Sequence, residues 1–180
     1  SFFRNGNNVS LYCADGSTKI EVTGGPISVN DEWAHMTGVF SSNNGNVTGK
    51  LYVNGSKVSE ASAQLNVNNI VSTSPLTFGF QGSVFSSAFL DLHLSDIHIW
   101  NIALNDDEVR ENSRRMEIAD NHPKISNLIG YWPMDDGDGI LKNKVVGKPN
   151  IPLQGNFQYK VGGNNLPYVD ESAILIQNVD

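Results

Sequence analysis

The sequence predicts an all-β protein, an antiparallel β-sandwich with one short helix and a C-terminal extension. Runs of alternating apolar and polar residues recur along the first hundred residues, at the roughly 8 to 12 residue spacing typical of sandwiches. Asn-Gly or Asp-Gly pairs separate these runs at Asn5-Gly6, Asp15-Gly16, Asn44-Gly45 and Asn54-Gly55. Such pairs supply the positive-φ positions of tight turns. Because hairpins join neighbouring strands, the sheets should be antiparallel.

We expect a strand wherever apolar residues alternate between these turns. In chain order the expected strands cover residues 10–13, 19–23, 33–40, 50–53, 76–80 and 88–100. The clearest hairpin turns at Asn54-Gly55. In the last strand Ser95-Asp96 adds one residue to the alternation, and a β-bulge there would keep the flanking aliphatic residues on the core face. These aliphatic residues are Leu90, Leu92, Leu94, Ile97 and Ile99.

One helix is expected directly after this strand. Asn105 can cap its N-terminus, and three acidic residues follow in the first turn, where negative charge suits the helix dipole. The helix should run over residues 106–119 and end before His122-Pro123, because proline restricts the residue before it. Further strands are expected in the extension, over residues 128–134, 153–159 and 173–176.

The acidic composition excludes some classes of partner. The net charge of −7 repels nucleic-acid phosphates and anionic lipids. No run approaches the roughly 20 apolar residues of a membrane-spanning helix. The single cysteine, Cys13, excludes an intrachain disulfide and a multi-cysteine zinc site. We therefore expect neither nucleic-acid binding nor membrane insertion.

Candidate metal ligands form two small groups. Asp135, Asp136 and Asp138 lie in a glycine-rich turn that could hold Ca²⁺, but the spacing and closing glutamate of an EF-hand loop are absent. We expect an acidic turn and no cofactor there, with calcium as the alternative. The second group lies on one expected strand and is interpreted as a solvated polar face: Asp91, His93, Asp96 and His98.

The sequence offers no convincing catalytic pair. Cys13 and His35 are a thiol and an imidazole in early strands, but a lone strand cysteine is usually an inert core residue. Asp91 and Asp96 come nearest to the paired carboxylates of glycoside hydrolysis, and they straddle the expected bulge. Residues 45–50 lack the spacing of a phosphate-binding loop. We therefore expect a protein that is not an enzyme.

Aromatic side chains are the candidate ligand-binding residues, because their rings can stack on sugars. Tyr52 is expected to be exposed, since it lies on the face of its strand opposite Leu51 and Val53. Trp33 and Trp100 are expected to pack in the core or at the sandwich edge. The ligand-binding candidates are Tyr52, Trp132 and Tyr159.

Three segments follow one another in an order and spacing seen in a known family. They are a Trp-x-His strand at residues 32–37, a Leu-Tyr-Val-Asn-Gly hairpin at 49–55, and an Asp-Ile-x-Ile-Trp-Asn strand at 95–104 that leads into the expected helix. Together they resemble the laminin-G-like, concanavalin A-like jelly roll, a fold that includes the pentraxins. The resemblance covers residues 31–111 and agrees with the sandwich predicted above.

The resemblance implies a non-catalytic accessory module that binds a polysaccharide or a surface protein. It implies an extracellular, cell-surface or periplasmic location, as in surface or secreted proteins of Bacteroidetes-type bacteria. The alternatives are an accessory part of a larger carbohydrate- or phosphoester-processing enzyme and a purely structural spacer. Residues 80–83 lack the acidic side chain with which pentraxin relatives help to bind calcium.

The same resemblance predicts two parts of the chain. Residues 1–121 should form the sandwich, whose opening strands are missing, and residues 122–180 an extension packed on it or a small second unit. Residues 128–134 resemble an opening strand of the family and could fill the vacant place as a permuted strand. The chain begins at Ser1 rather than Met, and we expect a processed piece whose targeting signal is lost.

Overall fold

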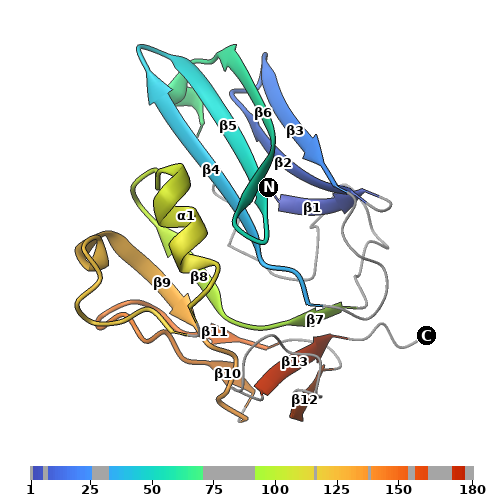
Figure 1. Ribbon diagram of the computed structural model, residues 1–180, viewed down its shortest axis with the longest axis vertical. Helices are drawn as coiled ribbons and strands as arrows, with labels where there is room; N and C mark the ends of the chain where they lie inside the picture. Colours follow the sequence, from blue (N-terminus) through green and yellow to red (C-terminus); the bar gives the residue numbers. More distant parts are fainter. Residues whose placement is uncertain are drawn as a thin grey trace. The chain divides into compact units, whose positions relative to one another are not determined.

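The computed structural model describes residues 2–5, 8–25, 33–70, 92–115, 117–137, 139–153, 157–161 and 172–176. Within these residues lie thirteen strands, one α-helix and two 3-10 helices, and every strand pair is antiparallel. The predicted all-β class is confirmed. The chain forms two compact units, unit 1 (Ser1–Thr73 and Ala103–Arg115) and unit 2 (Ser74–Ile102 and Met116–Asp180) (Figure 1).

Unit 1 contains two three-stranded sheets, each a run of hairpins, in the orders β1-β2-β3 and β4-β5-β6. The two-residue turn between β4 and β5 has φ of 50° at Asn44 and 81° at Gly45, and the turn between β5 and β6 has 49° at Asn54 and 75° at Gly55. Both turns therefore have the positive φ values that Asn-Gly pairs favour. The elements are β1 (Phe2–Asn5), β2 (Asn8–Ala14), β3 (Lys19–Gly24), β4 (Met36–Asn43), β5 (Asn46–Val53), β6 (Ser56–Gln64), η1 (Val67–Asn69) and α1 (Asp106–Asn112).

The two sheets of unit 1 enclose one apolar cluster. Alternation along β3 buries Ile20 and Val22, while their neighbours stay exposed. Glycine lets the sheets approach closely, because a Cβ at Gly49 would lie 2.8 Å from the side chains of Phe40 and Val22. The packed sheets are the core of a sandwich. The buried members of the cluster are Val9, Leu11, Ile20, Val22, Val47, Leu51 and Leu65.

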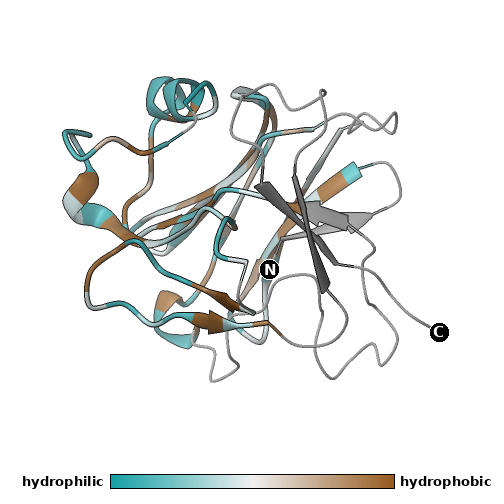
Figure 2. Cartoon of the chain, turned by 90° about the horizontal axis from the view of Figure 1, so that it is seen from below, coloured by the Kyte–Doolittle hydropathy of each residue, from teal (hydrophilic) through white to brown (hydrophobic). Residues whose placement is uncertain are grey.

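Helix α1 begins where the sequence predicts. Asn105 Oδ1 accepts a hydrogen bond from Glu108 N at 2.9 Å, and Glu108 Oε2 accepts one from Asn105 N at 2.8 Å. This capping box satisfies two backbone donors that the first turn leaves without helical partners. Figure 2 shows α1 as mostly hydrophilic, which fits a short helix whose apolar anchor is the buried Val109.

The helix ends earlier than expected, at Asn112 rather than residue 119. The Ser113 hydroxyl donates to the Arg110 carbonyl at 2.9 Å, a bond within the last turn that competes with helical continuation. Arg115 N donates to the Asn112 carbonyl at 3.1 Å, a tighter pattern than the α-helix. None of the helices in the described segments is both long and apolar enough to span a membrane.

Unit 2 is assembled from strands that lie far apart in the sequence. Its sheets have the orders β12-β13-β7, β8-β9 and β10-β11. The strands expected at residues 128–134 and 173–176 are confirmed as β9 and β13, and they pair with β8 and β7. The elements are β7 (Leu92–Leu94), β8 (Ile97–Trp100), η2 (Ile125–Asn127), β9 (Leu128–Trp132), β10 (Ile140–Leu141), β11 (Ile151–Pro152), β12 (Phe157–Val161) and β13 (Ser172–Ile176).

The core of unit 2 uses the aliphatic side chains expected in the Ile-Trp-Asn strand. Leu94, Ile97 and Ile99 pack, partly buried, against the buried Trp132 and Met134. The expected single bulged strand over residues 88–100 is wrong, because β7 and β8 belong to different sheets. Asp96 has a φ of 57°, a left-handed conformation that breaks the chain direction between the two strands.

Two further strand boundaries differ from the expectation. The strand expected over residues 33–40 starts only at Met36, because His35 bonds to the turn between β5 and β6. His35 N donates to Asn54 Oδ1 at 2.9 Å, and Asn54 N donates to the His35 carbonyl at 2.7 Å. The strand expected over 153–159 is replaced by β11 and β12. The strand expected over 76–80 lies outside the described residues.

Candidate functional site

Strands β8 and β9 carry a face on which aromatic and polar side chains alternate with the core residues. Ile97 and Ile99 point into the apolar core of unit 2. Because neighbouring side chains of a strand point to opposite faces, His98 and Trp100 lie on the other face, and the register places Tyr131 opposite His98. We call His98, Trp100 and Tyr131 the polar aromatic face.

The rings of this face are largely covered. Tyr131 is 9% exposed and lies in a buried cluster with Ile118 and Leu128. Trp100 and Val145 pack, partly buried, against this cluster.

The centroids of His98 and Tyr131 are 4.6 Å apart, and those of Trp100 and His122 are 5.0 Å apart, both in tilted arrangements. Asp96 Oδ1 lies 3.2 Å from His98 Nε2. Asp96 is the partly exposed member of this pair, since its side chain is 28% exposed against 11% for that of His98.

The electrostatic surroundings keep the Tyr131 hydroxyl protonated. Burial raises the pKa of Tyr131, and the negative charges of Asp96, Glu117 and Asp135 raise it further, because each disfavours a phenolate. A neutral phenol can donate and accept hydrogen bonds. The face therefore combines largely covered rings with a partly exposed carboxylate, that of Asp96, which can accept hydrogen bonds from sugar hydroxyls.

Tyr52, predicted as an exposed platform, is only 1% exposed, so that expectation is wrong. Its hydroxyl donates to Asp106 Oδ1 at 2.8 Å, and Lys50 Nζ lies 3.2 Å from the same oxygen. A register shift separates Leu51 from Tyr52. Leu51 enters the apolar cluster, while Tyr52 is bound to the first residue of α1, which the alternation of β5 alone cannot reveal.

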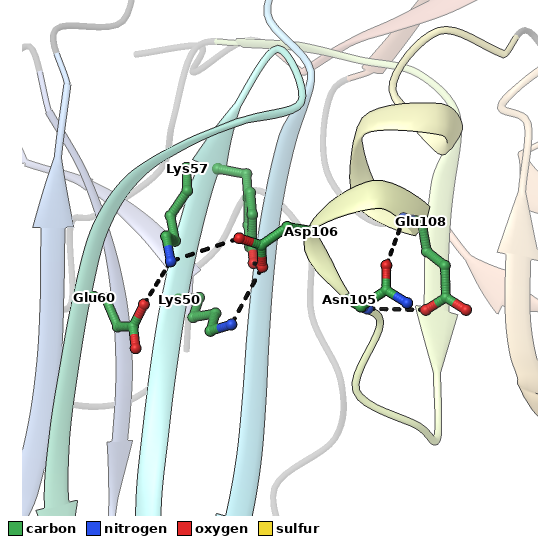
Figure 3. A network of polar contacts seen from close by, with 7 residues as sticks. Lys50, Lys57, Glu60, Asn105, Asp106 and Glu108 are labelled. Carbon is green, nitrogen blue, oxygen red and sulfur yellow. Dashed lines mark hydrogen bonds and ion pairs between the residues drawn. The ribbon is translucent and has the colours of Figure 1, made fainter.

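The groups around Tyr52 satisfy one another (Figure 3). Lys57 Nζ lies 2.8 Å from Glu60 Oε2 and 3.6 Å from Asp106 Oδ2. The hydrogen bonds from Tyr52 and Lys50 lower the pKa of Asp106, and burial raises the pKa of Tyr52. This network fastens α1 to β5 and β6, so we assign it to the scaffold of unit 1.

Trp132, the second predicted ligand-binding residue, is a core residue that is 4% exposed. It packs with Met134 and Leu141, and its ring lies over Gly130, where an added Cβ would be 2.4 Å from the indole. Tyr159, the third, lies in β12, and its side chain lies outside the described residues. Its role in binding stays a prediction.

The acidic turn uses its carboxylates within the protein. Asp136 Oδ2 accepts a hydrogen bond from Lys142 N at 2.8 Å, and the Asp136 side chain is 4% exposed. Asp138 lies outside the described residues. In the described ranges no group of three or more His, Cys, Asp or Glu side chains could hold a metal ion. Calcium binding at this turn stays untested.

The other candidates for chemistry are Cys13, in unit 1, and the residues Asp91 and His93. Cys13 packs, half-buried, against the apolar cluster of unit 1, and burial raises the pKa of its thiol. Asp91 and the side chain of His93 are outside the described residues. Sequence reasoning considered His98 only as a metal ligand and did not group it with Tyr131. The alternation of apolar residues in each strand could have shown this grouping, because His98 and Tyr131 alternate with core residues and therefore lie on the other face of their strands.

A comparison with family models finds one match. Residues 1–110 match the laminin G model described as the concanavalin A-like lectin/glucanases superfamily. The chain belongs to this superfamily. The resemblance to a laminin-G-like, concanavalin A-like domain is thereby confirmed. Searches of curated proteins and of solved structures return no match. The matched segment of this superfamily member includes β8 but ends before β9, so Tyr131 of the polar aromatic face lies beyond it.

Proposed function

We propose that this chain is a non-catalytic module that binds a polysaccharide outside the cytoplasm. Membership of the lectin/glucanases superfamily supports carbohydrate or protein binding. This membership carries the proposal, and the candidate contact surface is formed by the partly exposed Asp96 and Trp100 at the edge of the polar aromatic face. Binding to a surface protein is the alternative.

The binding mode follows from the chemistry of this face. The C–H surface of a pyranose packs against aromatic rings, and its hydroxyls bond to groups that can donate and accept. The partly exposed edge of Trp100 can pack against the sugar, while the partly exposed Asp96 carboxylate can accept hydrogen bonds from its hydroxyls. A carboxylate acceptor strengthens such bonds relative to a neutral one.

The carboxylates around this face are engaged in holding the site. Asp96 lies beside His98, and Asp135 Oδ1 lies 4.0 Å from Lys144 Nζ. Hydrolysis of a glycosidic bond needs two carboxylates that flank the bond, one as acid and one as base or nucleophile. We assign Asp96 a binding role, and a catalytic domain of a larger protein would supply any turnover.

Affinity electrophoresis on a panel of soluble polysaccharides tests the proposal. We expect retardation by at least one polysaccharide, and Asp96→Asn should weaken it about tenfold, because the hydrogen bond from a sugar hydroxyl to a charged acceptor is lost. Asparagine tolerates the left-handed backbone at this position, so the fold should persist. Asp120→Asn, an exposed residue of the same unit, is the matched control.

Three results would overturn parts of this proposal. Equal retardation of the Asp96→Asn variant and the wild type would remove the face from the binding site. Release of reducing ends from any polysaccharide would contradict the non-catalytic assignment. Absence of retardation throughout the panel, with capture of a cell-surface protein, would favour the protein-binding alternative.

A further inference from the structure

Two turns of unit 1 carry the same Asn-Gly pair in different surroundings. Asn44-Gly45 joins β4 to β5, and Asn54-Gly55 joins β5 to β6. In both turns the asparagine and the glycine have positive φ, so the two backbones are folded alike. Both asparagines are exposed, but Gly45 is partly exposed while Gly55 is buried. The two turns therefore differ mainly in the groups that contact them.

An Asn-Gly pair can undergo an intramolecular reaction. The backbone nitrogen of the glycine attacks the side-chain carbonyl carbon of the asparagine, a C–N bond forms, and the side-chain amide leaves with the proton of that nitrogen as ammonia. Water then opens the cyclic imide at one of its two carbonyl groups and yields aspartate or isoaspartate. Glycine favours the attack because no Cβ shields its nitrogen. The rate depends on whether the turn lets the two reacting groups meet.

The second turn restrains both reacting groups. Asn54 Oδ1 accepts a hydrogen bond from His35 N at 2.9 Å, and Asn54 N donates to the His35 carbonyl at 2.7 Å. Gly55 lies against the end of α1, where an added Cβ would be 2.3 Å from Ser113 Oγ and 3.1 Å from Arg110 Cα. Rotation of the Asn54 side chain would break its bond to His35, and rotation of the following peptide would meet the helix.

The first turn is held only through its carbonyl groups. Gln64 Nε2 donates to the Asn44 carbonyl at 3.0 Å, and Leu65 N donates to the Gly45 carbonyl at 2.9 Å. Among the residues that the structure describes, no hydrogen bond to the Asn44 side chain or from Gly45 N is found. An added Cβ on Gly45 would come nearest to Gln64 Nε2, the end of an exposed and flexible side chain. Less structure must therefore move for this turn to react.

We infer that Asn44 is a site of spontaneous deamidation and that Asn54, although a glycine follows it too, is protected. This inference does not depend on the proposed function. The isoaspartate product continues the chain through its side-chain carbonyl and so adds a methylene to the backbone between residues 44 and 45. The Gly45 carbonyl bonds to Leu65, a buried member of the apolar cluster. Deamidation at Asn44 therefore adds a negative charge and destabilises unit 1.

Peptide mapping of the full chain after incubation at mildly alkaline pH tests this inference. Trypsin cleaves after Lys19, Lys50 and Lys57, so Asn44 and Asn54 fall in separate peptides. In the folded protein we expect Asn44 to be lost at least about fivefold faster than Asn54, because the second turn restrains the reacting groups. In urea neither turn is restrained, and the two rates should agree within about twofold. A sample taken before incubation corrects for deamidation during digestion.

Asn44→Asp is the matched control variant. It carries the charge of the aspartate product but has no amide to lose, and aspartate tolerates the left-handed backbone at this position. After incubation the wild type should contain isoaspartate at residue 44 and melt at a lower temperature than the fresh protein. Asn44→Asp should keep its initial melting temperature over the same period.

Three mapping results would overturn the inference. Equal rates at Asn44 and Asn54 in the folded protein would show that the surroundings of the turns do not matter. Faster loss at Asn54 would show that the bond from His35 activates the side-chain carbonyl instead of restraining it. Loss at Asn44 in urea alone would show that the first turn also prevents the reaction. An unchanged melting temperature after conversion of Asn44 would contradict the predicted destabilisation of unit 1.

Discussion

Units 1 and 2 are built in opposite ways. In unit 1 each strand pairs with its neighbour in the sequence, through two-residue turns such as Asn44-Gly45 and Asn54-Gly55. In unit 2 the strands β7 and β8 find their partners, β13 and β9, at least 28 residues further along the chain, as in the pairing of Trp100 with Leu128. Local turns fix the first unit, whereas apolar packing must fix the second.

The two units also differ in whether their polar side chains bond to one another or remain open to a ligand. Polar groups on β5, β6 and α1 of unit 1 bond to one another, as Lys57 does with Glu60 and Asp106. In unit 2 Asp96 and Trp100 are partly exposed beside the buried Tyr131. A binding site in unit 2 thus depends on long-range pairing that no local motif specifies.

Loss of the Trp132 side chain should have the largest effect. Trp132→Ala removes the central ring of the unit 2 core and should cost about 3 to 5 kcal/mol in the free energy of unfolding. Denaturant unfolding measures this cost. Gly130→Ala should also destabilise, because its Cβ would meet the indole. A loss below about 1 kcal/mol for Trp132→Ala would show that the ring is not packed as described.

Leu51→Ala tests the core of unit 1. Leu51 is fully buried between the two sheets, and its truncation should cost about 2 to 5 kcal/mol. Val58→Ala, at an exposed position on the neighbouring strand β6, is the control and should stay within about 0.5 kcal/mol. Hydrogen exchange should then show lost protection in β2 to β6 and unchanged protection in β8 and β9, since the two core clusters share no residue.

A smaller effect is expected at the helix cap. Asn105→Ala removes the side-chain acceptor for Glu108 N and should cost about 1 kcal/mol. Asn105→Asp, which keeps an acceptor oxygen, should retain most of the wild-type stability. If thermal unfolding of Asn105→Ala matched that of the wild type, the capping box would not contribute to the stability of unit 1.

The pH dependence of stability offers the finest comparison. Asp15 accepts bonds from Ser17 and Thr18 through Oδ1 and from Asn66 N through Oδ2, and these bonds lower its pKa. Because the carboxyl pKa is lower in the folded than in the unfolded protein, ionised Asp15 stabilises the fold at any pH above the unfolded-state pKa of about 3.9. This contribution is lost as the pH falls below that value toward the folded-state pKa. Asp15→Asn should flatten the acid limb of stability against pH, whereas Asp120→Asn should not.

Local signals in the sequence predicted unit 1 well. The Asn-Gly turns and the Asn105 cap act over a few residues, so the hairpins and the start of α1 could be predicted. The burial of Tyr52 could not, because it depends on a register shift and on α1, which is 54 residues distant. The break at Asp96 was also missed, since only the separate partners of β7 and β8 reveal it.

The candidate site was predicted only in its chemistry. Aromatic stacking was expected, but the chosen rings, Tyr52 and Trp132, are buried in the two units. Trp100 and Tyr131 come together only through the pairing of β8 with β9. Without that register the sequence cannot show that Tyr131 is buried beside His98 while Trp100 stays partly exposed.

The central claim is that unit 2, and not unit 1, binds the polysaccharide. The most direct measurement is a titration of the full chain with the polysaccharide that retards it most in electrophoresis, followed by amide chemical shifts. The account predicts shifts at Asp96, His98 and Trp100, with β4 to β6 unperturbed. Shifts that cluster instead on β4 to β6 would contradict it.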